Sequence, residues 1–262
     1  MQLSAAQITQ FHRDGFLILR DFLEAEKCDA ISTLAKKHLE DKVEPLETEL
    51  AYNAQSKEAR TQERDYESKT EKSEKVVRRL RQVYDRDILF KNWMENEKLR
   101  PVLQQLLEDQ VVLTTAHHNS IMTKLAGVST ATAWHQDRRY WRYSDDNLIS
   151  VWLALDEETS HNGSLEFIPK SHTMTFKTED FNEKEYLCEK NSKNQSLMSH
   201  KVSTKLHKGD VVIFHSLLLH RANKNASQKD KISFVYTVKG AKTKALEGSR
   251  SSEFEEFKLT LL

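Results

Sequence analysis

Hydrophobic positions follow two different periods along this chain, and the change falls near residue 110. Before that point apolar residues recur every three or four positions, which is the spacing of one face of a helix. Beyond it they gather in short segments rich in β-branched and aromatic residues, which turn signals such as Asn162-Gly163 separate. Helices followed by many short strands predict an α+β protein whose second half is a β-sandwich or barrel.

The same pattern places individual elements. Ser4 and Gln7 match a capping box ahead of a short apolar face, and Gly15 follows as a stop signal. The N-terminal part predicts helices over about 5–13 and 25–39, a strand over 16–22, and two or three helices between 76 and 107. The C-terminal part predicts strands at 111–116, 119–125, 147–155, 164–169, 210–215 and 231–238.

A charged insert interrupts the N-terminal part at about residues 40–75. Within it, residues 51–75 carry little apolar material, which predicts a solvated helix, a mobile lid or a disordered segment. A chain of 262 residues fits one well-cored domain. We therefore expect a single domain over 1–262, with a helical part at about 1–108 and a β core at about 109–240.

Composition narrows the classes of function. Lys plus Arg and Asp plus Glu are both 40, so the formal net charge of zero argues against a general nucleic-acid-binding protein. No stretch reaches about 18 continuous apolar residues, so we expect no membrane span. The N-terminus lacks the basic start and apolar run of a secretory signal, and Cys28 and Cys188 are isolated. These features favour a cytoplasmic protein with reduced, structural cysteines.

The triplet His135-Gln136-Asp137 is the leading candidate for chemistry. In an extended strand the side chains of residues i and i+2 point to the same face, so the imidazole and the carboxylate converge. A third ligand from a distant strand would complete the two-histidine, one-carboxylate triad of non-haem iron(II) oxygenases, which leaves positions open for co-substrate and dioxygen. The triplet at 12–14 has the same spacing, but side chains so spaced diverge on a helix, and we interpret His12 as a surface residue.

Residues 134–172 and 209–227 resemble the phytanoyl-CoA dioxygenase family. The shared motifs are, in chain order, WHQD at 134–137, Trp-x-x-Leu-Asp at 152–156, Asn-Gly at 162–163, Pro-x-Ser-His at 169–172, Gly-Asp at 209–210 and Asn-x-Ser at 225–227. The opening residues also look like the family's usual start, so the resemblance covers most of the chain except roughly 40–75. It implies a double-stranded β-helix core with flanking N-terminal helices, and it implies His220 as the third iron ligand beside His135 and Asp137.

The resemblance further implies iron(II) as the metal and 2-oxoglutarate as co-substrate. In the family an arginine, on the strand after the distal histidine, grips the far carboxylate of 2-oxoglutarate. This chain has no arginine there, and a lysine is expected to replace it. Alignment on the following strand favours Lys229, whereas counting from His220 favours Lys231. Further candidates for the co-substrate pocket lie on matched motifs or just before them: Lys124, Gln136 and Trp152.

Together these features predict a dioxygenase that hydroxylates a small organic substrate with dioxygen and releases succinate and carbon dioxide. A halogenase of the same family would carry Ala or Gly in place of Asp137. A non-catalytic, ligand-binding relative would be expected to lose a metal ligand, and an altered co-substrate is the other alternative. Arg138, Arg139 and Tyr140 are candidates to meet an anionic substrate. We expect structural roles for His117, His118, His172 and His215.

Overall fold

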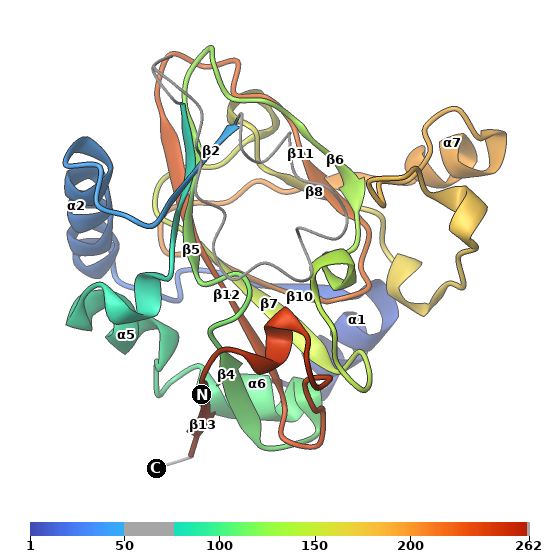
Figure 1. Cartoon of the computed structure of the whole chain (residues 1–262), viewed down its shortest axis with the longest axis horizontal. Coiled ribbons are helices and arrows are strands. Elements are labelled where there is room, and N and C mark those ends of the chain that lie inside the picture. The colour runs from blue at the N-terminus through green and yellow to red at the C-terminus, as the bar shows by residue number, and fades with distance from the viewer. Residues whose placement is uncertain (50–75, 261–262) are drawn as a thin grey trace.

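Two antiparallel sheets form the centre of the computed structural model, which describes residues 1–49 and 76–260 (Figure 1). The helices are α1 (Ala5–Asp14), α2 (Ala25–Glu40), α5 (Ile88–Met94), α6 (Arg100–Leu107) and α7 (Ser192–Met198). The strands are β1 (Phe16–Leu19), β2 (Leu46–Thr48), β3 (Val77–Arg81), β4 (Val111–Thr114), β5 (Ser120–Lys124), β6 (Thr132–His135), β7 (Leu148–Ala154), β8 (Leu165–Phe167), β9 (Val202–Ser203), β10 (Val211–His215), β11 (His220–Ala222), β12 (Lys231–Gly240) and β13 (Glu256–Leu259). The stretch 51–75, for which the sequence leaves helix, lid or disordered segment open, lies outside the described residues.

The larger sheet runs in the order β1-β10-β7-β12-β5-β3-β2, with β4 on β12 and β13 on β4. The smaller sheet runs β6-β11-β8-β9 and faces the larger one across the molecule (Figure 1). Apolar side chains of both sheets meet between them, Trp152 and Phe214 from the larger sheet against Leu165 and Phe167 from the smaller one. This arrangement confirms the expected α+β fold with a double-stranded β-helix core.

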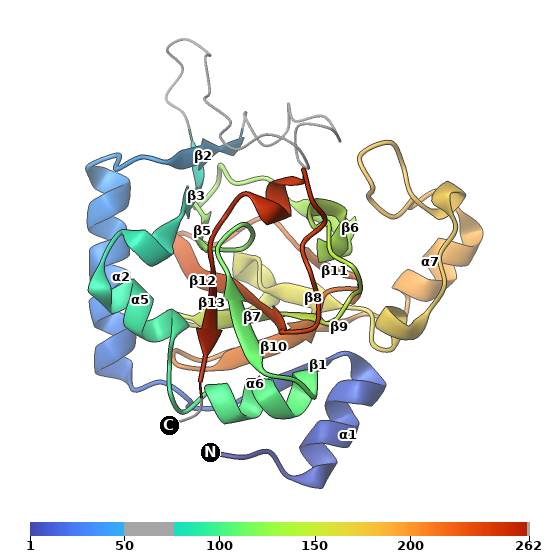
Figure 2. The same ribbon diagram turned by 60° about the horizontal axis from the view of Figure 1, so that its bottom comes forward.

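Alternation along β7 and β12 sorts side chains between the outside and the inside of this core. Residues such as Val151 on β7 and Phe234 on β12 belong to the main apolar cluster together with residues of α1, α2, α5 and α6. These helices lie outside the two sheets (Figure 2). The residues next to Val151 and Phe234 on the same strands, Trp152 and Val235, point inward to the space between the sheets. Period-2 alternation therefore determines which side chains can reach the centre.

The strands expected beyond residue 110 are confirmed, whereas the expectation for 76–107 is partly wrong. Two helices occur there, but Val77–Arg81 is strand β3, and the sequence reading placed no strand at β2. The apparent helical spacing arose because Leu80 sits on β3 while Val83 and Tyr84 belong to a following 3₁₀ turn. Ion pairs explain how an arginine-rich strand is buried: Arg78 pairs with Glu49 and Arg79 with Glu47.

None of the helices among the described residues is long and apolar enough to cross a membrane.

Gly209 allows a close backbone contact between the N-terminal segment and the strand β10. Its φ is +89°, and a Cβ added there would lie 2.2 Å from the carbonyl oxygen of Leu23. Gly209→Ala is therefore expected to destabilise the fold by more than the ~1–2 kcal/mol of a left-handed alanine alone. Gly248→Ala is the matched control, because Gly248 has φ +72° but no atom within 4 Å of the added Cβ. Equal losses of unfolding free energy in denaturant titrations of the two variants would contradict the contact.

Candidate metal centre

His135, Asp137 and His220 converge from two adjacent strands of the smaller sheet and the turn that follows one of them. His135 is the last residue of β6, and His220 is the first of β11 and its direct partner across the strand pair. Gln136 keeps an extended backbone, with φ −108° and ψ 141°, before Asp137 begins a 3₁₀ turn. The extended residue between them returns the side chains of His135 and Asp137 to one side, as their spacing predicts.

The distances fit one small cation. The Nε2 atom of His220 lies 3.4 Å and that of His135 lies 3.8 Å from Oδ1 of Asp137. One ligand atom from each residue lies within 4.8 Å of the others, and all three side chains are buried. Among the described residues, these three form the one group of three or more His, Cys, Asp or Glu side chains whose ligand atoms lie close enough together to hold a metal ion.

Hydrogen bonds orient each of the three side chains. Nδ1 of His135 lies 2.9 Å from the carbonyl oxygen of Ala133, and Nδ1 of His220 lies 3.0 Å from that of Leu218. A carbonyl can only accept, so each Nδ1 carries the proton and each Nε2 is left with a lone pair for a metal.

The carboxylate of Asp137 is oriented in the same way. Ser150 donates to its Oδ2 at 2.7 Å. Oδ1 is buried and has no hydrogen-bond partner among the described residues. A buried acceptor without a partner costs free energy. Oδ1 is therefore the atom that a metal ion would satisfy, and the donor set fits a divalent cation.

Electrostatics supports an ionised Asp137 and a neutral His135, and it draws a proton towards His220. Burial alone would raise the pKa of Asp137, but the imidazoles of His118, His220 and His135 hold it well below its usual range. Burial and the neighbouring His220 lower the pKa of His135 well below its ordinary value. Burial disfavours protonation of His220, but Asp137 outweighs that effect and raises its pKa. Asp137 is thus ionised at neutral pH, and an ionised buried carboxylate requires a cation close to it.

A cavity of about 70 Å³ adjoins the triad between the two sheets. Lys124, Trp152 and Lys231 line it, together with the three triad residues. Lys231 faces inward because it alternates with the outward-facing residues of β12, starting at Ile232.

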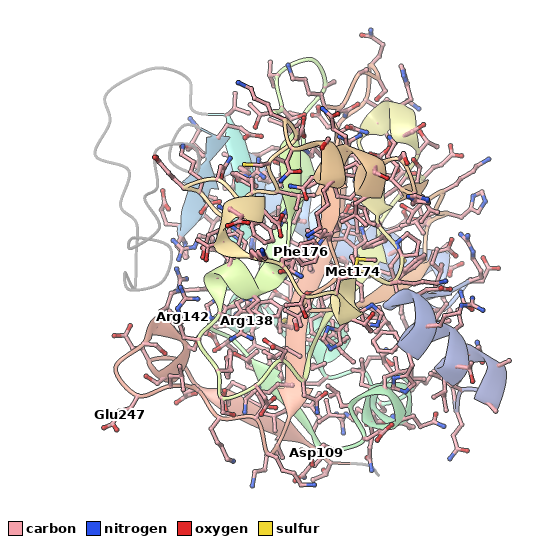
Figure 3. The ribbon with its side chains drawn as sticks, turned by 90° about the vertical axis from the view of Figure 1, so that its right-hand side faces the viewer. Asp109, Arg138, Arg142, Met174, Phe176 and Glu247 are labelled. Atoms are coloured by element: carbon pink, nitrogen blue, oxygen red, sulfur yellow. The ribbon has the colours of Figure 1, made fainter. Side chains whose placement is uncertain are left out.

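Two of the residues proposed from the sequence for this pocket do not line it. Lys229 precedes β12 and its side chain is exposed. The Gln136 amide donates to the carbonyl of Leu217 at 2.5 Å. Gln136 lies instead at a second cavity of about 660 Å³, which Arg138, Arg142 and Phe176 also line. These last three residues lie on one side of the molecule (Figure 3).

Lys124 and Lys231 are direct partners across the β5–β12 pair. The Lys231 ammonium donates to Glu158 at 2.8 Å, whereas that of Lys124 donates to the backbone carbonyl of Thr130 at 2.6 Å. Burial, with Arg78 and Lys231 adding to it, lowers the pKa of Lys124 to about 7, although Glu49 opposes the shift. Two buried ammonium groups on adjacent strands therefore line the same cavity as the triad.

His118, for which the sequence predicted a structural role, also lies beside the candidate metal site. Its Nε2 lies 3.3 Å from Oδ1 of Asp137, and its Nδ1 lies 3.2 Å from the hydroxyl of Ser150. Its neighbour His117 turns to the other side and bonds Ser251. The alternation of adjacent residues was the available signal, because it allows one of the two histidines to face inward.

The remaining histidines lie away from the triad. His12 is half-exposed on α1, where its ring faces Glu108. His172 and His215 pack against each other with ring centroids 5.4 Å apart. His172 also bonds the carbonyl of His12. Their contacts fit the structural and surface roles expected for them.

The basic residues after Asp137 are engaged with other groups. Arg138 forms an ion pair with Asp146, and the guanidinium of Arg139 lies 3.8 Å from the ring centroid of Tyr186. Tyr140 is the residue of this stretch that lines the cavity beside the triad. Arg138 and Arg139 line the second cavity and not the one beside the triad, and Arg138 lies on the side shown in Figure 3.

Ser150 offers a test of how the ligands are oriented. Ser150→Ala removes the donor to Oδ2 of Asp137 and is expected to weaken metal affinity by about 10–100-fold, the usual effect of losing such a partner. Ser164→Ala is the matched control, because this equally buried serine donates to the backbone carbonyl of Thr204. Competition with a chelator of known affinity measures both variants. Equal affinities in the parent and Ser150→Ala would show that the hydroxyl does not orient Asp137.

Comparison with known proteins agrees with this geometry. The chain is 26% identical over 182 residues to a phytanoyl-CoA dioxygenase domain-containing protein 1 homolog of Caenorhabditis briggsae, covering 65% of this chain and 60% of that protein. It is 24% identical over 174 residues to the ectoine dioxygenase of Sphingopyxis alaskensis, covering 65% and 50%. The chain thus spans between half and two thirds of the length of these relatives.

Solved structures show the same fold. The crystal structure of the epimerase SnoN in complex with Fe³⁺, alpha-ketoglutarate and nogalamycin RO superimposes with a TM-score of 0.72, at 15% identity, over 93% of this chain and 86% of SnoN. The sequence profile of the phytanoyl-CoA dioxygenase family matches residues 11–233, a span that contains His135, Asp137 and His220. The chain therefore belongs to the phytanoyl-CoA dioxygenase family.

Proposed function

We propose that this protein is an iron(II)- and 2-oxoglutarate-dependent oxygenase that hydroxylates a small organic substrate. The observation that carries the proposal is the buried triad, in which two oriented Nε2 atoms and an unpartnered carboxylate oxygen face one point. Two further facts support it. A cation-lined cavity adjoins the triad, and the structural neighbour SnoN was determined with iron and alpha-ketoglutarate.

His135, Asp137 and His220 would hold the metal and leave open positions on its remaining face. Iron(II) bound there would supply redox activation of dioxygen, with 2-oxoglutarate as the source of the additional electrons. One oxygen atom would enter succinate as carbon dioxide leaves, and the other would enter the substrate as a hydroxyl group. The two orienting carbonyl groups keep both imidazoles in the tautomer that binds a metal.

The far carboxylate of 2-oxoglutarate would lie beside Lys124 and Lys231. Both ammonium groups are buried, and both side chains line the cavity. Of the two lysines left open by the sequence, we assign this role to Lys231, because Lys229 is exposed outside the cavity. Trp152 supplies an apolar wall beside Lys231, whose ammonium lies 5.3 Å from the centroid of the Trp152 ring.

The alternatives have less support. A halogenase would need a non-ligating residue in place of Asp137, which instead faces both histidines. A non-catalytic relative would not be expected to keep three buried, oriented ligands. The geometry therefore favours hydroxylation over halogenation or simple ligand binding.

Turnover of the co-substrate tests the proposed function. Iron-loaded protein is expected to convert 2-oxoglutarate into succinate and carbon dioxide in equal amounts, and a productive substrate should accelerate this conversion. Asp137→Ala is the control for reactions of free iron. Equal succinate formation by the parent and by Asp137→Ala, in a screen of candidate substrates, would rule the proposal out.

A further inference from the structure

The cations that line the cavity beside the triad differ in how their charge is balanced. Among the described residues, most of them form an ion pair with a buried glutamate. These pairs are Arg78 with Glu49, Arg79 with Glu47, Arg221 with Glu166, and Lys231 with Glu158. Lys124 is the exception in this part of the chain, because its ammonium donates to the carbonyl of Thr130 and forms no ion pair with a described carboxylate. When these four glutamates are counted with the cations that they pair, Lys124 is the described lining cation outside the triad whose charge no carboxylate balances in an ion pair.

Glu158 is held firmly beside Lys231. It is fully buried, and its Oε1 accepts from the Trp152 indole at 3.0 Å and from the Ser233 hydroxyl at 2.6 Å. Its Oε2 accepts from the Lys231 ammonium at 2.8 Å. Glu158 does not itself line the cavity, so it lies behind Lys231. A carboxylate entering the cavity would meet an ammonium group that is already neutralised.

We propose that Glu158 is an internal counter-ion that restrains co-substrate binding by neutralising Lys231. Lys124 then supplies the net positive charge that attracts the far carboxylate of 2-oxoglutarate, and Lys231 supplies only a hydrogen bond to it. This inference rests on the proposed function. It assigns to Glu158 a role in setting co-substrate affinity, and it divides between two lysines the role that a single arginine would otherwise perform. The reason is charge balance, because a buried carboxylate is disfavoured unless a cation compensates it.

The protonation of Lys124 provides a readout that a structural lysine would not give. Its pKa is lowered to about 7 by burial, then by Arg78 and Lys231, while Glu49 opposes the shift. A lowered pKa means that the ammonium loses its proton as pH rises above about 7. Affinity for 2-oxoglutarate should therefore fall as pH rises through this range. Lys124→Met should flatten that dependence.

Glu158→Gln is the first test, with anaerobic calorimetry of 2-oxoglutarate binding to the iron-loaded protein. The substitution removes the negative charge and keeps the size of the side chain. Affinity is expected to increase by about 3–10-fold, because the charge of Lys231 becomes available to the ligand. Weaker binding by Glu158→Gln would overturn the inference, since Glu158 would then act only by holding Lys231 in place.

Removing the whole ion pair is the second test. The double variant Lys231→Met with Glu158→Gln deletes both charges and is expected to bind 2-oxoglutarate within about threefold of the parent. Lys124→Met deletes the uncompensated charge and is expected to weaken binding by at least about tenfold. A double variant that binds as weakly as Lys124→Met would overturn the division of roles.

Thermal unfolding of the same variants tests the ion pair independently of ligand. Lys231→Met leaves the Glu158 carboxylate buried without its cation, so its melting temperature should fall, and adding Glu158→Gln should restore most of the loss. No restoration would contradict the pair. If the iron-loaded parent fails to bind 2-oxoglutarate, the proposed function falls and this inference with it; if the parent binds but the variants rank otherwise, the inference alone falls.

Discussion

Alanine in place of His135, Asp137 or His220 is expected to abolish stoichiometric iron binding while leaving the fold largely intact. Each substitution removes one of three converging ligand atoms. His135 ends β6, His220 begins β11 and Asp137 begins the turn after β6, so none of the three side chains determines the pairing of the strands. Loss of one ligand from a site with three protein ligands leaves too few donors for tight binding. Metal analysis after reconstitution and gel filtration, with circular dichroism for the fold, measures both outcomes.

His12→Ala is the matched control for these variants. His12 belongs to a second histidine-x-aspartate triplet, but it lies half-exposed on α1. Its substitution should change neither the iron content nor the fold. Full iron occupancy in both His135→Ala and His220→Ala would disprove the assigned ligands.

Loss of either buried lysine is expected to raise the half-saturating concentration of 2-oxoglutarate by about 10–100-fold, or roughly 1.4–2.7 kcal/mol. The reasons differ between the two positions. Lys124→Met removes the cation that has no described carboxylate partner, whereas Lys231→Met leaves Glu158 as an unpaired buried anion that repels the ligand. Iron affinity should hardly change, because neither lysine is a ligand. Succinate formation against 2-oxoglutarate concentration measures the effect.

Lys229→Ala is the control for Lys231→Met, because the two lysines are two residues apart but Lys229 lies in the loop before β12. Lys229 precedes β12 and is exposed, so its substitution should leave 2-oxoglutarate saturation unchanged. If Lys229→Ala has a large effect and Lys231→Met saturates like the parent, Lys229 in the loop before β12 is the residue that binds the far carboxylate. A double variant of Lys124 and Lys231 that saturates like the parent would place the carboxylate elsewhere, with Arg221 next to examine.

The candidate metal site could be predicted from sequence because local geometry determines most of it. Two ligands separated by one extended residue share a face wherever the chain forms a strand, and Gln136 is extended in the structure. The third ligand, His220, came from resemblance, because no local rule pairs β11 with β6. The sequence could not decide which of His117 and His118 faces the site for the same reason, because the position of His118 beside Asp137 depends on contacts with distant residues.

The choice between Lys229 and Lys231 depended on where β12 begins. Starting at Lys231, the strand alternates between the cavity and the outer apolar cluster, so Lys231 faces inward and Lys229 stays in the preceding loop. Element boundaries are poorly determined by sequence patterns, and a shift of one residue exchanges the two faces. Strand β3 was misread for a different reason, because the helical spacing of Leu80, Val83 and Tyr84 extends over a strand and the turn that follows it. The arginines of β3 are buried through ion pairs with Glu47 and Glu49.

The most direct test of the central claim is an anaerobic titration of the protein with iron(II) and then 2-oxoglutarate, followed by visible absorption. Chelation of iron by the keto-acid end of 2-oxoglutarate gives a weak charge-transfer band. The proposed function predicts this band at one equivalent of each component in the parent protein, and its absence in Asp137→Ala. Stoichiometric iron binding without the band at saturating 2-oxoglutarate would contradict the claim and indicate a different co-substrate.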